Sequence, residues 1–100
     1  MVFMSITVNF FANFREATGV DRIEVKRAED LDKLLKWLVA RFGKDLEKDL
    51  YEEGKVCDFV SVLVNGRGVP TDKPNATKLR DGDIVSIFPI ISGGLIGGVC

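Results

Sequence analysis

The sequence predicts one α+β domain in which a mixed sheet packs against one main helix. Short runs rich in Val, Ile and Phe recur along the chain, several with apolar residues at every second position, which is typical of strands. Residues 31–42 instead repeat apolar residues at spacings of three and four, which is typical of a helix with one buried face. A chain of 100 residues, 46% hydrophobic and 29% charged, is long enough for one core and too short for a second.

The first two strands are predicted at the start of the chain. Residues 2–11 alternate and present one mostly apolar face. The residues on that face are Met4, Ile6, Val8 and Phe10. Residues 12–19 lose the alternation and end in the turn-like pair Thr18-Gly19, so we expect a loop there. Residues 22–26 alternate again and predict the second arm of a hairpin that is exposed on one side.

The main helix is predicted over residues 31–42. Glu29 and Asp30 stand where a capping or first-turn acid is favourable, and Gly43 is placed to end the helix. The apolar stripe consists of Leu31, Leu34, Leu35, Leu38, Val39 and Phe42. Side chains of this size along one helix face need a sheet to cover them.

Trp37 lies off this stripe, by about 120° at ~100° per residue. It therefore belongs either at the flank of the core or in a surface that binds a partner. Residues 44–53 carry many charges with apolar residues at helical spacing, which predicts a second helical segment closing at Gly54.

A further strand is predicted over residues 56–64. The apolar run 59–64 inside it indicates burial on both faces. The pair Asn65-Gly66 is favoured in reverse turns and should end the strand. Residues 69–78 form a polar, proline-containing connection with room for a short edge piece.

The last strand is predicted over residues 84–88. Asp81-Gly82 supplies turn chemistry before it, because glycine tolerates positive φ and aspartate can bond its own backbone. Pro89 should end the pairing, because proline has no N–H to give to a ladder. Strand, strand, helix, strand, connection, strand is the order of a β-grasp fold, in which the first and last strands are parallel and central.

Composition excludes several classes of function. The formal net charge of −1 gives no reason to expect a nucleic acid or an anionic membrane as partner. No apolar run approaches the roughly 18–20 residues of a membrane span. The N-terminal residues do not have the pattern of a secretory leader, so we expect a cytoplasmic protein.

The residues also predict no active site within the chain itself. There is no histidine, so Ser61, Ser92 and Cys57 have no usual general base. The two cysteines, Cys57 and Cys100, do not have the spacing of a metal site, and residues 65–68 do not have that of a phosphate-binding loop. We therefore expect no bound metal and no bound cofactor, and no catalysis by the chain alone.

Residues 79–94 form a more specific pattern. A turn of the type Leu-x-Asp-Gly-Asp-x-Val is followed by a strand ending in Phe88-Pro89 and then by the tail Ser92-Gly93-Gly94. This stretch resembles the C-terminal signature of the MoaD/ThiS family of ubiquitin-like sulfur carriers. Weaker likenesses lie in Phe10-Phe11-Ala12 with Arg15-Glu16, and in the run that ends at Asn65-Gly66. Helix length and the Phe-Pro pair fit the MoaD branch, the small subunit of molybdopterin synthase, better than ThiS.

The resemblance implies chemistry on the tail. The carboxylate of Gly94 would attack the α-phosphate of ATP held by a MoeB/ThiF-like adenylating enzyme. A sulfur donor would then displace AMP and leave a thiocarboxylate, which would deliver sulfur to a pterin precursor inside the MoaE-like large subunit of molybdopterin synthase. Gly93 and Ser92 would thread into these partners, and Phe88, Pro89 and Ile90 would either dock them or pack at the strand end. Arg15 would face a partner or solvent.

The chain departs from the family pattern after Gly94, where six further residues follow. While Leu95 is attached, the Gly94 carbonyl is an amide with no free carboxylate. We therefore expect a domain over residues 1–94 and an extension over residues 95–100 that a processing protease removes, after Gly94 or after Gly98. Two alternatives stay open: a ubiquitin-like small protein modifier joined to lysines, and a β-grasp interaction module with an unprocessed tail.

Overall fold

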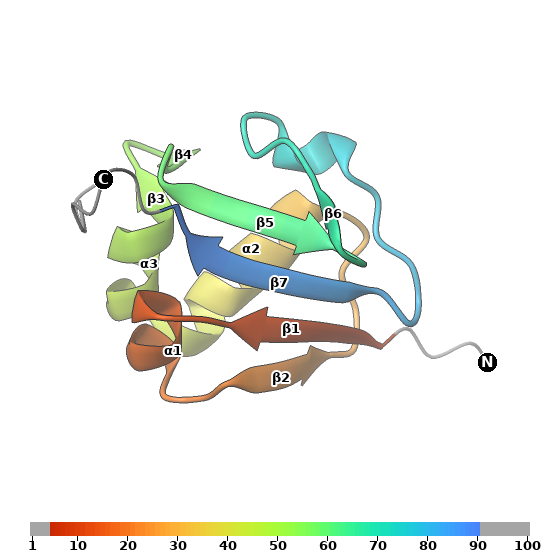
Figure 1. The fold of residues 1–100 in the computed structure, drawn as a ribbon, viewed down its shortest axis with the longest axis horizontal. Coiled ribbons are helices and arrows are strands. Elements are labelled where there is room, and N and C mark those ends of the chain that lie inside the picture. The colour runs from red at the N-terminus through yellow and green to blue at the C-terminus, as the bar shows by residue number, and fades with distance from the viewer. Residues whose placement is uncertain (1–4, 91–100) are drawn as a thin grey trace.

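The computed structural model describes residues 5–90, which form a five-stranded mixed sheet with helices packed on one face (Figure 1). The strands of this sheet are β1 (Ile6–Phe10), β2 (Arg22–Val25), β5 (Val60–Val64), β6 (Arg67–Gly68) and β7 (Ile84–Pro89). The helices are α1 (Asn13–Thr18), α2 (Leu31–Phe42), α3 (Lys44–Leu50) and the short 3-10 helix η1 (Pro74–Ala76). A separate hairpin pairs β3 (Tyr51–Glu52) with β4 (Lys55–Val56).

The strand order β2-β1-β7-β5-β6 is that of a β-grasp, as predicted. Strands β1 and β2 form an antiparallel hairpin, and β1 pairs in parallel with β7. The first and last strands of the fold are thus neighbours at the centre of the sheet. Strand β5 pairs antiparallel with β7 on its other side.

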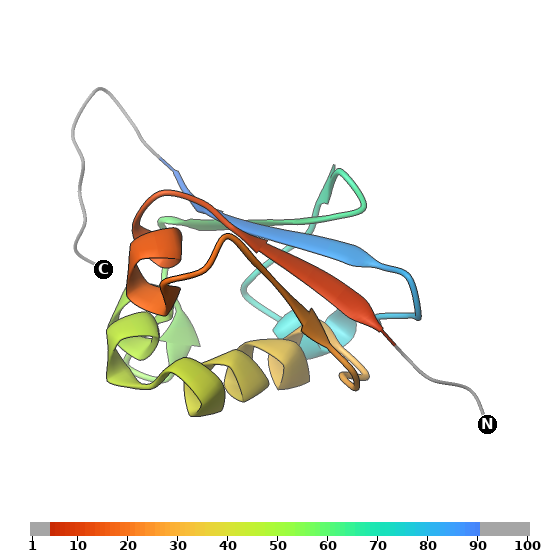
Figure 2. The same cartoon turned by 90° about the horizontal axis from the view of Figure 1, so that it is seen from below.

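The core lies between α2 and the sheet, as the helix periodicity predicts (Figure 2). Four leucines of the stripe are fully buried, and its last members, Val39 and Phe42, are half-buried. These helix residues pack against one face of β1, β5 and β7. These sheet residues are Ile6, Val8, Phe10, Val60, Val62, Val85 and Ile87.

Both ends of α2 confirm the sequence prediction. Asp30 is the N-cap, and its Oδ1 accepts a hydrogen bond from the Lys33 backbone N–H at 2.8 Å. Gly43 ends the helix with φ of 83°, and its N–H donates to the Val39 carbonyl at 2.7 Å. Trp37 projects from the same helix with 39% of its surface exposed.

The loop predicted over residues 12–19 is wrong, because Asn13–Thr18 forms α1. Phe14, which is 1% exposed, anchors this helix to the core. A helix this short carries too few apolar positions to show a period in the sequence, and no side chain caps its start. The predicted turn at Thr18-Gly19 is confirmed, since Gly19 ends the helix with φ of 76°.

The strand predicted over residues 56–64 is also partly wrong. Only Val60–Val64 enters the main sheet as β5, while Lys55–Val56 pairs with Tyr51–Glu52. The second helical segment accordingly ends at Leu50 instead of residue 53. Burial on both faces is wrong as well, because helices cover one face of β5 only and Phe59 is 44% exposed.

The turns of the second half fall where the sequence places them. Asn65 and Gly66 have φ of 53° and 84°, the positive values that a tight hairpin turn needs, and they connect β5 to β6. The edge piece expected within residues 69–78 instead lies just before them, at Arg67–Gly68. Within residues 5–90, no helix has the length and apolar character needed to cross a membrane.

Candidate functional site

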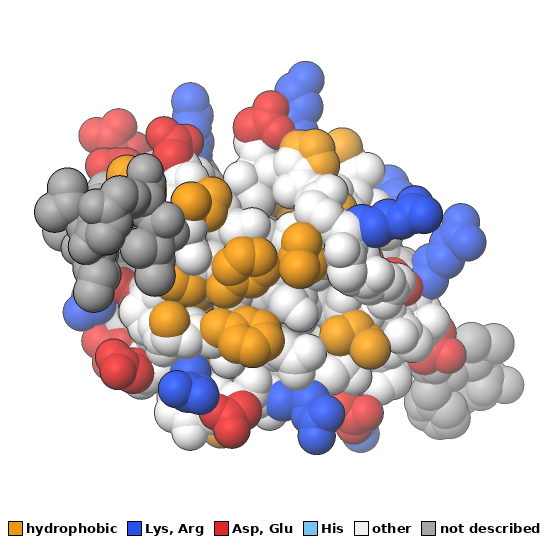
Figure 3. Space-filling view, viewed as in Figure 1, with side chains coloured by type: hydrophobic (Ala, Val, Ile, Leu, Met, Phe, Trp, Pro, Cys, Tyr) orange, Lys and Arg blue, Asp and Glu red, His pale blue; other side chains and the backbone are white. Residues whose placement is uncertain are grey.

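An apolar patch lies on the face of the sheet that the helices leave open. Figure 3 shows hydrophobic side chains gathered over β7 and its neighbours on this face. Alternation along the strands and the pairing of β7 with β1 and β5 place five side chains together on this side. We call these residues the open-face patch: Phe11, Phe59, Leu63, Phe88 and Ile90.

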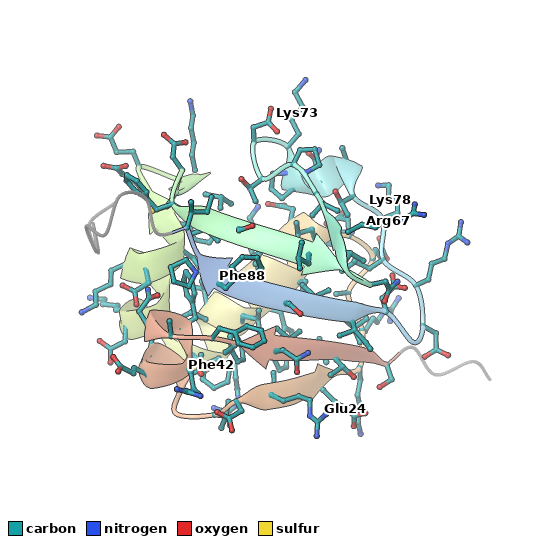
Figure 4. All side chains as sticks on the ribbon, viewed as in Figure 1. Glu24, Phe42, Arg67, Lys73, Lys78 and Phe88 are labelled. Carbon is teal, nitrogen blue, oxygen red and sulfur yellow. The ribbon has the colours of Figure 1, made fainter. Side chains whose placement is uncertain are left out.

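Two aromatic rings form the centre of the open-face patch. Phe88, labelled in Figure 4, extends from β7, and its ring meets that of Phe11 edge to face, with centroids 6.4 Å apart and planes at 86°. The Phe11 backbone N–H donates to the Ile87 carbonyl at 3.2 Å, which holds this residue beside β7 after β1 has ended. Phe11 is still 47% exposed, so the pair presents ring surface to solvent.

The strand that carries the tail ends at this patch. The Ile90 backbone N–H donates to the Phe59 carbonyl at 2.7 Å, which extends the pairing one residue past the strand. Successive residues of a strand direct their N–H groups to opposite sides. Pro89 therefore lacks an N–H only on the side of β1, which has already ended at Phe10. The proline costs no ladder bond to β5.

The predicted docking residues are thus separated into two groups. Phe88 and Ile90 share the open face, where Ile90 is 47% exposed. Pro89 is paired with Val60, lies on the side of the sheet that faces the helices, and is half-buried. Ser92, Gly93 and Gly94 lie outside the described residues, and so does the extension from residue 95. Their predicted roles stay predictions.

Sequence reasoning missed Phe11, Phe59 and Leu63 as site residues. The signal for Phe11 was present, because it is an apolar residue on the otherwise polar face of the first strand. The apolar run 59–64 predicts Phe59 and Leu63 as core residues, but the core lies on the other side of β5.

The opposite end of β7 is fixed by the Asp-Gly-Asp turn. Asp81 Oδ1 accepts from the Ser5 N–H at 2.7 Å, and the Gly82 N–H donates to the Ser5 carbonyl at 2.8 Å. Asp83 Oδ2 accepts from the Arg80 N–H at 2.8 Å. Gly82 has φ of 87°, as its predicted place in a turn requires. Both carboxylates of the motif are therefore occupied in holding β7 in place.

Arg15 lies on the surface beside the open-face patch. Its Nε is 3.6 Å from Asp21 Oδ1, and both side chains are largely exposed. The two residues line a hollow of about 430 Å³ together with Phe11, Asn9, Phe10 and Arg22. An exposed pair of this kind contributes little to stability, and whether Arg15 faces a partner or solvent stays a prediction.

An acidic hollow of about 490 Å³ lies near the β3–β4 hairpin. Its carboxylates belong to Asp32, Glu52, Glu53, Asp58 and Asp72. In the part of the chain that the structure describes, no three His, Cys, Asp or Glu side chains are arranged to hold a metal ion. Tyr51 also lines this hollow; burial, with help from Asp32 and Glu47, raises the pKa of its phenol to about 12. The phenol stays protonated at neutral pH and cannot serve as a base there.

Comparisons with known proteins show which family this chain is similar to. The model of the ThiS family matches residues 8–94. Small archaeal modifier protein 3 of Haloferax volcanii is 40% identical over 93 residues, which cover 91% of this chain and 100% of the relative. Sulfur carrier protein CysO of Mycobacterium tuberculosis is 30% identical over 93 residues, with the same coverage. The solved structure of a candidate molybdopterin converting factor subunit 1 of Pyrococcus furiosus has a TM-score of 0.69 and 32% identity, and covers 88% of this chain and 99% of that one.

Proposed function

Because the chain belongs to the ThiS family of ubiquitin-like sulfur carriers and small archaeal modifiers, we propose that it carries sulfur for synthesis of the molybdopterin cofactor of molybdenum or tungsten. The observation that carries the proposal is the end of β7: the strand delivers the chain to an exposed apolar patch, four residues before Gly94. The likeness to a candidate molybdopterin converting factor subunit supports the choice of pathway.

The proposed chemistry begins with hydrolysis of the Gly94–Leu95 amide bond, which leaves a carboxylate on Gly94. An oxygen of this carboxylate attacks the α-phosphate of ATP and releases pyrophosphate, so the tail becomes an acyl-adenylate. A hydrosulfide equivalent adds to the acyl carbon and AMP leaves, which gives the thiocarboxylate. Transfer of that sulfur to the pterin precursor and attack of water on the acyl carbon restore the carboxylate. The chain is substrate and carrier in every step.

The role of the folded body is to aim the tail. Ile90 is the last residue that a hydrogen bond from the sheet holds among the described residues. Gly94 is the fourth residue after Ile90, and an extended chain spans at most about 3.6 Å per residue, so Gly94 reaches about 14 Å from Ile90. A partner must therefore place its reacting phosphate or pterin within that distance of the docked patch. Ser92 and the two glycines are narrow enough to enter such a channel.

The open-face patch would supply the docking surface for the partners. These are the MoeB/ThiF-like adenylating enzyme and the MoaE-like large subunit of molybdopterin synthase. Exposed aromatic rings at the centre of an interface carry a large share of binding energy. Both partners need the same tail, so both should bind the same face and exclude one another.

A second candidate function is supported by the relative of Haloferax volcanii, which is named a small archaeal modifier protein. In that role the Gly94 adenylate reacts with a lysine amine of a target protein, AMP leaves, and an isopeptide bond forms. The first step is common to both functions. An untrimmed chain would perform neither and would be an interaction module.

The proposal is tested with a purified ThiF-like adenylating enzyme, ATP and two forms of the chain. The form ending at Gly94 should release pyrophosphate and gain the mass of an adenylate, while the chain of 100 residues should do neither. Addition of a sulfur donor should then convert the adenylate to a thiocarboxylate that a molybdopterin synthase large subunit consumes. If the form ending at Gly94 is not adenylated, the proposal fails; if it is adenylated but found joined to lysines in cells, the modifier function is favoured.

A further inference from the structure

We propose that two copies of this chain pair through the outer edge of β2, so that the sheet continues from one molecule into the next. The occupant of this edge is a second copy, in an antiparallel register centred on Ile23. The inference goes beyond the proposed function, because it concerns the folded body and needs neither the tail nor an activated carboxylate.

The first observation is that β2 is an open edge of the sheet. It is the outermost strand of the order β2-β1-β7-β5-β6, and among the described strands only β1 pairs with it. Figure 1 shows none of the described helices or strands beyond it. The opposite edge, β6, is only two residues long. Because an unpaired strand edge is a template for another strand, β2 is the edge at which pairing can occur.

The second observation is which backbone groups of β2 face outward. The Phe10 N–H donates to the Asp21 carbonyl at 2.8 Å, so Asp21 directs its backbone groups toward β1. Successive residues of a strand direct these groups to opposite sides, so Ile23 also faces β1, whereas Arg22 and Glu24 face away from the sheet. These two residues therefore supply the N–H and C=O groups that a second strand would meet.

The third observation is that the same two residues carry opposite charges. Both side chains are exposed, and they lie on the open face because the buried Val25 faces the helices; Glu24 is labelled in Figure 4. The Ser5 hydroxyl donates to Glu24 Oε1 at 3.3 Å. Within residues 5–90, neither Arg22 nor Glu24 forms an ion pair. Figure 3 shows acidic and basic side chains along this margin. Both charges can therefore pair with a second molecule.

A two-fold antiparallel pairing uses these backbone groups and these charges in the same register. When the axis passes through Ile23, Arg22 of each copy lies opposite Glu24 of the other. Each such pair then exchanges both N–H···O bonds, since the backbone groups of both residues face outward. Opposite charges on directly facing residues stabilise a sheet. The two half-buried Ile23 side chains meet at the axis, on the side of the helices.

Other registers of the same strand are unfavourable. An axis through Glu24 places this carboxylate opposite its own copy and Arg22 opposite Lys26, so like charges meet at both positions. An axis through Arg22 places two guanidinium groups opposite one another. An axis through Val25 requires pairing at Lys26 and beyond, where β2 has ended. An axis between two residues places outward-facing backbone groups opposite inward-facing ones, so the bonds cannot form. The edge is thus complementary to itself in one alignment.

Pairing of this kind leaves both docking surfaces accessible. Directly opposite residues have their side chains on the same face, so the two sheets join with their open faces on one side. In each copy β1 and β2 lie between β7 and the axis, and strands lie about 4.8 Å apart, so the two β7 strands are about 24 Å apart. A pair would present two open-face patches to a partner that itself has two binding sites, which strengthens binding through effective concentration.

The test follows the full chain over a range of concentrations. The interface consists of one short strand from each copy, so we expect a dissociation constant on the order of 1 mM. Between about 0.05 mM and about 2 mM, diffusion measured by nuclear magnetic resonance should slow as the dimer forms. The amide signals of Arg22 and Glu24 should shift and their hydrogens should exchange more slowly. The amide signals of Arg67 and Gly68, on the opposite edge, should not change.

Charge variants of the full chain test the register. R22E and E24R each place like charges opposite one another and should raise the dissociation constant at least tenfold. An equimolar mixture of these two variants should form a heterodimer, and the double variant R22E/E24R should pair with itself again. Both side chains are exposed, so the folds should stay intact, which circular dichroism checks. Phe88→Ser is the control, because it alters the open-face patch and should leave pairing unchanged.

Either of two results would overturn the inference. One is a chain that stays monomeric over the whole range, with unchanged amide signals of Arg22 and Glu24. The other is association that the charge variants leave unchanged or that Phe88→Ser abolishes, which would assign the contact to another surface. Neither result affects adenylation of the chain ending at Gly94, which needs no pairing, so failure here is distinct from failure of the proposed function.

Discussion

The side chain of Asn65 joins the hairpin after β5 to the beginning of β7 through Asp83. Its Nδ2 donates to Asp83 Oδ1 at 2.9 Å, and its Oδ1 accepts from the Ile84 N–H at 2.8 Å. The Asn65 N–H donates in turn to the Ile84 carbonyl at 2.8 Å. Asp81, three residues before β7, accepts from the Ser5 N–H just before β1, so the start of β7 is held from both sides. The position of its far end, where the tail begins, follows from that anchoring.

Replacement of Asn65 by alanine should destabilise the fold. Two side-chain hydrogen bonds are lost, and alanine is strained at φ of 53°, which together predict a loss of about 2–4 kcal/mol in the free energy of unfolding. Chemical denaturation followed by circular dichroism measures it. Asn65→Gly is the matched control, because it loses the same bonds without the strain and should lose less. Equal losses in both variants would show that the backbone strain is absent.

Replacement of Ala12 by glycine should stabilise the fold. Ala12 has φ of 52° and ψ of −125° between β1 and α1, a conformation that glycine adopts readily and alanine does not. Ala12→Gly should therefore raise the free energy of unfolding by about 1 kcal/mol, after the entropy cost of glycine is subtracted. The measurement is the denaturation midpoint at unchanged slope. A decrease would contradict the strained geometry.

The raised pKa of Tyr51 predicts that the fold loses stability at alkaline pH. The folded pKa of Tyr51 is about 12 against an ordinary 10.0, so the unfolded chain releases the proton first. The stabilisation due to this group is complete below pH 10 and is lost as pH rises through about 12. The chain has one tyrosine, so the ultraviolet absorbance of tyrosinate reports this group alone.

The matched variant for this prediction is Tyr51→Phe. Its hydroxyl has no hydrogen-bond partner among the described residues, so removing it should change stability at neutral pH by less than about 1 kcal/mol. Above pH 10 the variant should lose stability less steeply than the parent. A titration midpoint near 10 in the folded parent would refute the burial of this phenol.

The open-face patch predicts a selective loss of partner binding. Phe88→Ser removes one ring of the central pair and should weaken binding to the adenylating enzyme by about tenfold or more. Ile84→Ser is the control, because Ile84 lies on the same strand and is 46% exposed, but at the end where β7 begins. Isothermal titration calorimetry of the adenylating enzyme with each variant, in the form ending at Gly94, gives both dissociation constants. Equal weakening by the two substitutions would show that binding does not depend on the patch.

The fold could be predicted from the sequence because its main elements have strong local patterns. The stripe of α2, the cap at Asp30 and the turn at Asn65-Gly66 all agree with the β-grasp topology. Helix α1 could not be predicted, because it depends on the burial of Phe14 by distant parts of the chain and not on a period of its own.

Only part of the open-face patch could be predicted from the sequence. The sequence predicts Phe88 and Ile90 as docking residues because they precede the tail, whereas it predicts Phe59 and Leu63 as core residues. A sequence shows that a residue is apolar, but not which face of the sheet the helices cover. The apolar side chains on the uncovered face form the open-face patch, so the error in β5 lies on the surface that we propose for docking.

The central claim is that Gly94 becomes the reactive end of this protein. The most direct measurement is the intact mass of the protein isolated from its native cells without overexpression. We predict a chain ending at Gly94, in part with sulfur in place of one terminal oxygen. A chain that ends at Cys100 in every molecule would contradict both the sulfur carrier and the modifier function.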